Sequence, residues 1–338
     1  MKVLLASNDA VEISFVRALL ADAGIDALVL DDFTAGMEGS IGAIPRRIMV
    51  ADPDIGAARN LLCAAGIGTA ARADGRGLTG AGGTMTDGDM AATLDGWAEE
   101  ALLGGRVRLL QPHRGYRAAI DPVLLAAAVP ARDGEAVLEL GAGAGAATLC
   151  LAARVPGCRL TALERQPEAA AALRQGVALN GWQDRIAVLE GDLRTPPPGL
   201  PLNGFDRVLM NPPFYEAGRH TPSPAPGKAA SHGEGEATLA DWVRAALRHL
   251  KGRGTLTLVH RADRLDAILA ALHGRFGGIV VFPLWPRAGQ PAKRVLVHAV
   301  RDGRGPLRLA SGLVLHGAEG RFTPAADDVL LHAAPLEL

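Results

Sequence analysis

Hydrophobic and polar positions over the first 66 residues predict a small α+β module. Apolar runs indicate three strands, at Lys2–Ala6, Ala27–Leu30 and Arg47–Val50. Apolar side chains at helical spacing predict one helix from Asn8-Asp9 to Gly24 and a second from Asp52-Pro53 to Gly66, because Asn and Asp often begin a helix and Gly often ends one. The predicted order is therefore βαββα over residues 1–66.

The pattern changes at residue 67. Between Ile67 and Asp95 the chain has seven glycines and few large apolar side chains. Such a stretch cannot bury enough apolar surface to offset its conformational entropy, so we expect a flexible linker at 67–95. A folded domain restarts near Trp97 and is expected to occupy 96–338.

Strand and helix patterns alternate in this second domain. The predicted strands are Val137–Leu140, Leu160–Leu163, Ile186–Leu189, Phe205–Met210, Thr255–Val259, Ile279–Phe282 and Arg294–His298. Helices are predicted between most of them, and a short one follows Asp121-Pro122. Such alternation is typical of a mostly parallel sheet with helices on both faces. The sequence thus predicts an α/β domain preceded by the α+β module.

A glycine-rich turn follows the first strand of that sheet. Gly141, Gly143 and Gly145 occupy alternate positions before a helix, so backbone amides can approach a ligand closely. The third glycine comes one residue too early for the dinucleotide fingerprint. Glu139 at the strand end would repel a pyrophosphate but suits a ligand with a cationic amine. A plain turn rich in Ala and Gly is the alternative interpretation.

Polar residues also end the next three strands. Glu164 lies 19 residues after Gly145, close to the spacing at which a carboxylate binds ribose hydroxyls in nucleotide-binding folds. Asp192 follows the third strand, and Asn211 follows the fourth. Each residue alone is compatible with a helix cap. Because open α/β sheets bind ligands at the carboxyl ends of their strands, the ordered set predicts a ligand site at that edge.

The fourth strand ends in the corner Asn211-Pro212-Pro213-Phe214. The two prolines fix φ at about −65° and remove two N–H donors, and the residue before a proline is extended. The corner presents a carboxamide, carbonyl oxygens and an aromatic ring, which together suit the binding of a planar amine. As an isolated motif it is better explained as a rigid turn, whereas the preceding glycine loop and acids favour a site.

Charge is distributed unevenly along the chain, whose net charge is −1. Residues 1–206 carry 18 Lys+Arg against 25 Asp+Glu, whereas residues 207–338 carry 17 against 11. The cationic part permits contact with an anionic partner, although an Arg-rich composition alone would give the same excess. The cysteines lack paired or metal-binding spacing, and neither a signal peptide nor a membrane-spanning run is apparent. We therefore expect a cytoplasmic protein without metal, and we assign no oligomeric state.

These ordered motifs resemble those of class I methyltransferases that use S-adenosylmethionine and share a Rossmann-like sheet with helices on both faces. The resemblance implies that the glycine loop lies against the methionine part of the cofactor, that Glu164 holds the ribose and that Asp192 contacts the adenine amine. The cofactor-binding set implied is Glu139, Gly141, Gly143, Gly145, Glu164 and Asp192. The corner resembles that of enzymes that methylate planar amino groups, which assigns Asn211, Pro212, Pro213 and Phe214 to catalysis.

A closer resemblance covers about residues 97–335. The segments LLGGRVRLLQPHRGYRAAIDPVLLAAAVPA and NPPFYEAGRHTPSP are similar to the bacterial family that methylates the adenine beside the anticodon of a valine tRNA. Tyr116 and Arg117 in the first segment are further cofactor-binding candidates. Two departures bear on the substrate: Phe214 stands where Tyr is common in adenine-specific members, and the better-known members lack the N-terminal module.

The resemblance implies methyl transfer to the exocyclic amine of a nucleobase, first of all adenine in tRNA. The candidate RNA contacts are Tyr215, Arg219, Lys228, His232, Lys293 and Arg294. Simple packing of Tyr215, a surface loop over 217–236 and a solvated hairpin tip before Arg294 are the alternative interpretations. Methylation of guanine in rRNA and of a protein glutamine are the alternatives among enzymes. A binding module with a degenerate methyltransferase core is the non-enzymatic alternative, and the intact acids and corner argue against it.

The N-terminal module resembles a small bacterial domain of unknown function that is associated with signal transduction. The segment EGSIGAIPRRIMV carries this resemblance. Its Arg46-Arg47 pair suits a phosphate or RNA ligand, but the solvated start of a strand explains the same pair.

Overall fold

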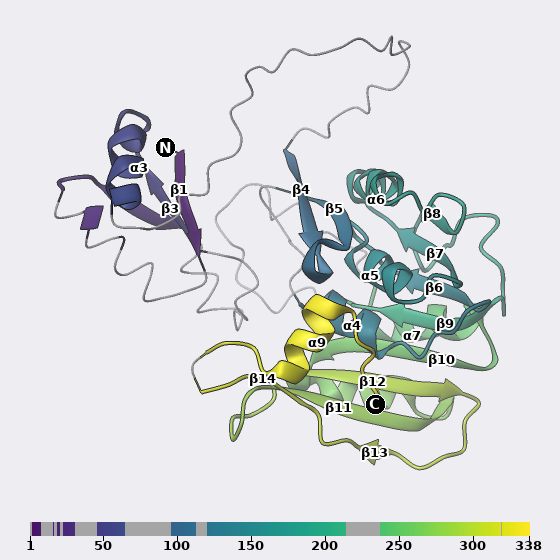
Figure 1. Cartoon of the computed structure of the whole chain (residues 1–338). Helices are drawn as coiled ribbons and strands as arrows, with labels where there is room; N and C mark the ends of the chain where they lie inside the picture. The colour runs from purple at the N-terminus through teal and green to yellow at the C-terminus, as the bar shows by residue number, and fades with distance from the viewer. Residues whose placement is uncertain are drawn as a thin grey trace, which may run out of the picture. The chain divides into compact units, whose positions relative to one another are not determined.

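The computed structural model describes residues 2–7, 16, 19–20, 23–30, 46–64, 96–112, 120–213, 237–318 and 320–338. These residues belong to two compact units, Met1–Thr93 and Leu94–Leu338 (Figure 1). The predicted linker lies outside the described residues, so its flexibility and the domain boundaries drawn around it stay predictions. Seven predicted site residues also lie outside them: Tyr116, Arg117, Phe214, Tyr215, Arg219, Lys228 and His232.

The first unit is a small antiparallel sheet with a helix packed on it. Its strands are β1 (Lys2–Ser7), β2 (Ala27–Leu30) and β3 (Arg46–Val50), in the order β1-β3-β2. A short 3-10 turn (Asp52–Asp54) leads into α3 (Ile55–Ala64). Leucine, isoleucine and valine side chains from the strands pack against α3 and against helical residues around Val16 and Leu20. The predicted α+β character of this module is confirmed.

The second unit is built on one large mixed sheet. Its strands are β6 (Ala136–Leu140), β7 (Arg159–Glu164), β8 (Ile186–Glu190), β9 (Phe205–Met210), β10 (Leu250–Arg261), β11 (Phe276–Arg287), β12 (Arg294–Arg301), β13 (Arg308–Leu309) and β14 (Leu313–His316). Across the sheet they run β13-β11-β12-β10-β9-β6-β7-β8, and β14 pairs with β11. Strands β6 to β10 are mutually parallel, while β12 is antiparallel to both its neighbours. The predicted α/β sheet is confirmed.

The chain order reverses direction between β6 and β9. From β6 it proceeds outward to β7 and β8, and it then returns to β9 and continues the other way to β10. Since crossovers between parallel strands are right-handed, the helices before and after this reversal cover opposite faces. Helices α4 (Asp121–Ala128), α5 (Ala146–Arg154) and α6 (Pro167–Leu179) belong to one side, and α7 (Leu239–His249) packs with α8 (Leu265–Leu272) on the other.

A large apolar cluster lies between the sheet and the pair α7 and α8. Strand residues such as Leu138, Met210 and Leu256 are fully buried there, together with Val243 and Ala246 of α7. At about 1.5–3 kcal/mol for each fully buried large apolar side chain, this cluster contributes a large part of the unit's stability. No helix among the described residues is long and apolar enough to cross a membrane.

A hairpin ahead of the sheet has no counterpart in the predicted elements. Strands β4 (Trp97–Leu102) and β5 (Val107–Pro112) pair antiparallel, and β5 packs against α6. The Asn180 carboxamide accepts from Arg108 N at 3.0 Å and donates to Arg108 O at 2.6 Å. The hairpin is thus fastened to the end of α6 by a reciprocal pair of hydrogen bonds.

The C-terminal segment links the far side of the sheet to α4. After β14, helix α9 (Pro324–His332) packs against α4, as Figure 1 shows in yellow. The backbone N–H of Leu336 donates to Ala127 O at 2.9 Å, and Arg106 donates to His332 O at 2.8 Å. The last residues therefore cap a helix that forms near the start of the unit.

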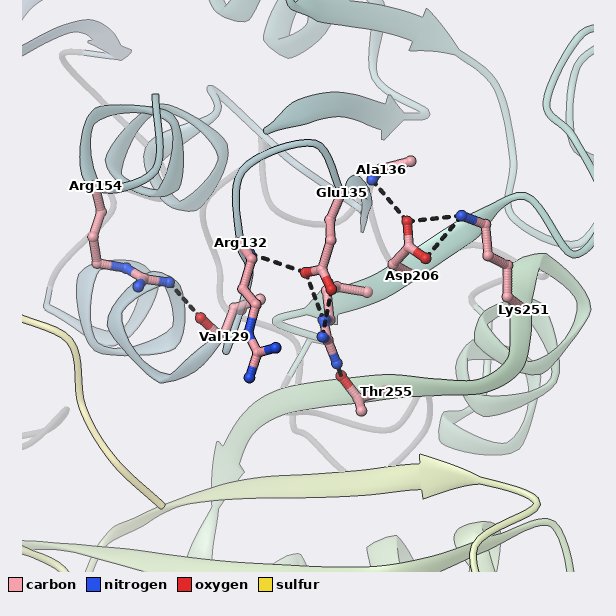
Figure 2. A network of polar contacts seen from close by, with 9 residues as sticks. Val129, Arg132, Glu135, Ala136, Arg154, Asp206, Lys251 and Thr255 are labelled. Atoms are coloured by element: carbon pink, nitrogen blue, oxygen red, sulfur yellow. Dashed lines mark hydrogen bonds and ion pairs between the residues drawn. The ribbon is translucent and has the colours of Figure 1, made fainter. Parts of the chain in front are cut away.

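A polar network holds the amino ends of the central strands in register (Figure 2). Arg207 of β9 binds both carboxylate oxygens of Glu135, with the shorter contact at 2.6 Å, and donates to Thr255 of β10 at 3.2 Å. Asp206 accepts from Ala136 N at 2.9 Å and from Lys251 at 2.8 Å. Strands β6, β9 and β10 are thereby tied together at the amino edge. The predicted ligand site lies at the opposite, carboxyl edge.

Candidate active site

The structure brings the four predicted strand-end residues to one edge of the sheet. Glu139 lies one residue before the end of β6, Glu164 ends β7, Asp192 follows β8 and Asn211 follows β9, and all four strands are parallel. In the pairing of β6 with β9, Leu140 faces Met210. Gly141 and Asn211 therefore begin their loops at the same level on strands about 4.8 Å apart. This is the reversal point of the strand order, where open α/β sheets bind ligands.

The glycine loop is held in a shape that other residues do not adopt easily. Gly141, Gly143 and Gly145 have φ of 66°, 55° and 86°. A Cβ on Gly141 would lie 2.3 Å from the Trp242 ring, and one on Gly145 would lie 2.0 Å from Leu173. A Cβ on Gly143 would meet no atom of the described residues within 4 Å. The outer glycines thus allow close packing, whereas no described side chain crowds the middle one, where a ligand can approach.

Glu164 supports this loop from the neighbouring strand. Its side chain is 5% exposed, and one carboxylate oxygen accepts from Gly143 N at 2.7 Å. The other oxygen accepts from Gln166 N at 2.8 Å, at the start of α6. A carboxylate has about four acceptor positions, so two hydrogen bonds leave capacity for ribose hydroxyls. The predicted ribose acid therefore also fixes the loop that faces the ligand.

Glu139 is buried beneath the same loop. It is 3% exposed and accepts a hydrogen bond from the Thr148 hydroxyl of α5. Burial raises the pKa of Glu139 to about 8, and the charge of Glu164 adds to this effect, while the hydrogen bond from Thr148 opposes it. A cation close to Glu139 would favour its ionised form. This placement is compatible with the predicted contact to an amine, which stays a prediction.

Asp192 is engaged by a residue that the sequence analysis did not identify. One of its oxygens accepts from Arg194 N at 2.8 Å and Arg194 Nε at 3.1 Å, and the other accepts from Arg194 Nη2 at 2.7 Å. These hydrogen bonds lower the pKa of Asp192. Arg194 therefore keeps Asp192 ionised and fixed in orientation. An Asp side chain often accepts a hydrogen bond from the backbone N–H two residues later, so the Asp-x-Arg spacing could have indicated this contact.

The proline corner lies where the sequence placed it. Asn211 is half-buried, Pro212 is buried and Pro213 is exposed. Pro213 has no N–H to donate, so the turn cannot close on itself by a hydrogen bond from that position. The aromatic residue of the motif, Phe214, lies outside the described residues, and its stacking role stays a prediction.

The two predicted RNA contacts at the start of β12 have different surroundings. Lys293 is exposed, whereas Arg294 is half-buried and donates from Nε to Asp121 at 3.0 Å. Burial raises the pKa of Asp121, and the charge of Arg294 opposes that rise. Arg294 thus fixes the first turn of α4 to the sheet, a role that the sequence analysis did not foresee.

Trp242 is a second residue of the site that the sequence did not reveal. It comes from α7, on the opposite face from α5 and α6, is 7% exposed, and lies directly against Gly141. Nothing in its local pattern distinguishes it from other apolar positions of an amphipathic helix. Its place follows only from the crossover that brings α7 under the glycine loop.

The residues present fit a nucleoside cofactor with an aminoacyl tail. No described residue crowds Gly143 of the loop, Glu164 retains acceptors for hydroxyls, and Asp192 is an ionised acceptor for an amine. When bound, S-adenosylmethionine supplies an electrophilic methyl group.

Comparisons with known proteins agree with this geometry. Residues 120–281 match the family model described as "Methyltransferase small domain", and residues 1–66 match the one described as "Putative prokaryotic signal transducing protein". The tRNA1(Val) (adenine(37)-N6)-methyltransferase of Aeromonas hydrophila is 32% identical over 210 residues, which cover 60% of this chain and 84% of the relative. The enzyme of the same name from Aeromonas salmonicida is 31% identical over equal shares.

A solved structure supports the fold. The crystal structure of a predicted O-methyltransferase from Agrobacterium tumefaciens has 32% sequence identity and a TM-score of 0.55, and the match covers 64% of this chain and 99% of that one. The methyltransferase fold and the use of S-adenosylmethionine are thereby confirmed, together with the predicted resemblance of the N-terminal module. The chain is an S-adenosylmethionine-dependent methyltransferase and belongs to the family of the tRNA1(Val) (adenine(37)-N6)-methyltransferases.

Proposed function

We propose that the enzyme methylates the exocyclic amine of an adenine in tRNA, at the position beside the anticodon. The observation that carries the proposal is the shared level of Gly141 and Asn211 on adjacent strands. It places a corner suited to a planar amine next to the loop that faces the cofactor. The relatives' substrate, adenine 37 of a valine tRNA, supports the same assignment.

The corner acts on the amine by orienting it. The lone pair of an adenine amine is delocalised into the ring, so the amine is a weak nucleophile. The Asn211 carboxamide oxygen and the Pro212 carbonyl oxygen each accept one N–H, which aims the lone pair out of the ring plane. The same two acceptors stabilise positive charge that develops on the nitrogen. Holding both partners in line supplies much of the remaining acceleration.

The rival substrates are separated by one assay. Purified full-length protein is incubated with labelled S-adenosylmethionine and a valine tRNA transcript, and the nucleosides are identified by mass spectrometry. We expect N6-methyladenosine, which disappears when adenine 37 is replaced by guanine. Methylguanosine, 2′-O-methylated nucleosides, or label in a protein substrate instead of tRNA would contradict the proposal.

The role of Asn211 is tested separately from cofactor binding. Asn211→Ala removes one acceptor at the developing charge and is expected to lower the rate by about 10²–10³, as for other single groups that stabilise a transition state. S-adenosylhomocysteine binding, measured by calorimetry, should stay within twofold of wild type. A variant that transfers methyl groups at the wild-type rate would refute this role.

A further inference from the structure

The carboxyl edge of the sheet continues well past the candidate active site. The strand register aligns Arg261 of β10 with Arg294 of β12, Arg294 with Leu284 of β11, and Leu284 with Leu313 of β14. At about 4.8 Å between neighbouring strands, β14 lies about 19 Å from β9, which carries Asn211. The edge is therefore long enough to hold several nucleotides beside a base placed at the corner.

Cations line this edge. Arg287 lies three residues beyond Leu284 on β11 and is aligned with His316 of β14. Lys293 directly precedes Arg294, the first residue of β12. Since side chains alternate along a strand, Trp285 and Arg287 share the face that α8 covers further inward. Both Arg287 and Lys293 are exposed, and Arg264 ends the turn that leads into α8.

An aromatic pair stands at the outer end of the same edge. The rings of His316 and Phe322 stack with centroids 4.7 Å apart and planes 21° from parallel. Burial lowers the pKa of His316, and the nearby charge of Arg287 acts in the same direction, so the ring is neutral at pH 7. Arg321, which is exposed, directly precedes Phe322. A neutral stacked pair flanked by arginines suits a nucleobase above it and a phosphate beside it.

We propose that these residues form a substrate-docking strip for RNA, which holds the part of the tRNA next to the methylated base. The strip consists of Arg264, Arg287, Lys293 and Arg321 with the His316–Phe322 pair. The proposal rests on the proposed function, because it takes RNA as the substrate and the corner as the point of methylation. It extends that function by placing the RNA backbone over β12, β11 and β14, the half of the edge that is remote from the cofactor loop.

The arrangement of acids favours phosphate at this strip. Asp263 and Asp121 bind Arg261 and Arg294, which lie at the inner end of the strip. They therefore hold the inner arginines in place, while Lys293 and Arg287 lie further out towards solvent. Phosphate contacts of this kind position a nucleic acid without reading its sequence, whereas an aromatic platform accepts any base. The strip is thus expected to raise the affinity for RNA without discriminating between bases.

A charge-matched pair of double variants tests the strip. Arg287→Glu with Lys293→Glu reverses two charges on it, and Arg275→Glu with Arg304→Glu reverses two exposed charges at the opposite, amino edge. Binding of a fluorescent valine tRNA transcript to the full-length protein is measured by anisotropy between 50 and 200 mM KCl. Since each phosphate contact contributes about 0.7 to the salt slope for single strands, the strip variant should lose about 1.4 in slope.

The same relation gives the loss of affinity. Losing two phosphate contacts, a change of about 1.4 in slope, should weaken tRNA binding of the strip variant at least about 25-fold at 0.1 M salt. The tRNA affinity of the amino-edge variant should stay within about threefold of wild type. Phe322→Leu, which keeps an apolar side chain but no ring, should weaken binding about fivefold or more. S-adenosylhomocysteine affinity serves as the folding control for every variant. Equal losses of tRNA affinity in the two double variants, or no loss in either, would refute the proposed role of the strip.

The outcomes separate the strip from the proposed function. If wild type forms N6-methyladenosine in tRNA but the strip variant binds tRNA normally, the strip is wrong and the function stands. If tRNA binding depends on the strip but no adenine is methylated, the strip stands and the proposed reaction is wrong.

Discussion

Replacing Glu164 by Gln should weaken cofactor binding through the loss of one charged acceptor. The carboxylate accepts two backbone N–H groups at 2.7 and 2.8 Å and retains acceptors for ribose hydroxyls. A glutamine has one carbonyl oxygen and one NH₂ group, so it cannot accept from both amides and also receive a hydroxyl. A hydrogen bond to a charged group contributes about 1.5–3 kcal/mol, which corresponds to roughly a 10- to 150-fold lower affinity.

Calorimetric titration with S-adenosylhomocysteine measures this change directly. Glu168→Gln is the matched control, because Glu168 is exposed in the first turn of α6 and its substitution removes the same charge four residues away. The hydrogen bond to Gly143 exists without the cofactor, so its loss should also lower the melting temperature. Affinity within twofold of wild type for Glu164→Gln, or an equal loss for Glu168→Gln, would refute the assignment of Glu164 to the ribose.

Three further outcomes follow from the geometry. Gly145→Ala would place a Cβ 2.0 Å from Leu173 at a φ of 86°, and overpacking of this kind costs about 1–3 kcal/mol, so the denaturant midpoint should fall. Glu135→Gln weakens the half-buried pair with Arg207 and should destabilise the fold while cofactor affinity stays unchanged, since this pair lies at the amino edge. The raised pKa of Glu139 means that the folded state binds the proton of this carboxyl more tightly than the unfolded chain does. The resulting stabilisation is complete below the unfolded pKa of about 4.5 and is lost as the pH rises through about 8. Glu139→Gln should therefore flatten the dependence of stability on pH in this range.

Each of these variants has an internal check. A Gly145→Ala protein as stable as wild type would show that the turn repacks freely. Parallel losses of stability and affinity in Glu135→Gln would show that the two edges are not independent. A melting temperature that rises between pH 6 and pH 8 in the wild type would contradict the burial of Glu139.

The sequence predicted those parts of the site that depend on a pattern within a few neighbouring residues. Strand ends followed by Glu164, Asp192 or Asn211 are visible because a buried parallel strand is a continuous apolar run that stops abruptly. The glycine loop is visible because three left-handed positions in five residues require glycine. These features depend on a few neighbouring residues, and the structure contains each of them where it was predicted.

What the sequence did not predict depends on contacts between distant segments. The hairpin β4–β5 is held by the packing of β5 on α6 and by Asn180, which directly follows that later helix. Strand β10 starts at Leu250, five residues before the predicted start, because a register irregularity carries the pairing across a polar, glycine-containing stretch. The placement of Trp242 under Gly141 and of Arg294 on Asp121 likewise requires the assembled sheet.

The closing contact between the end of the chain and α4 has a consequence for synthesis. Every residue of helix α4 is buried, yet part of its cover is α9, and Ala127 O accepts a hydrogen bond from Leu336 N. Until residues 324–336 have been synthesised, α4 lacks these contacts. Contacts of such long sequence separation slow folding, so we expect the methyltransferase unit to complete its folding only when these residues are available and to need protection from aggregation until then.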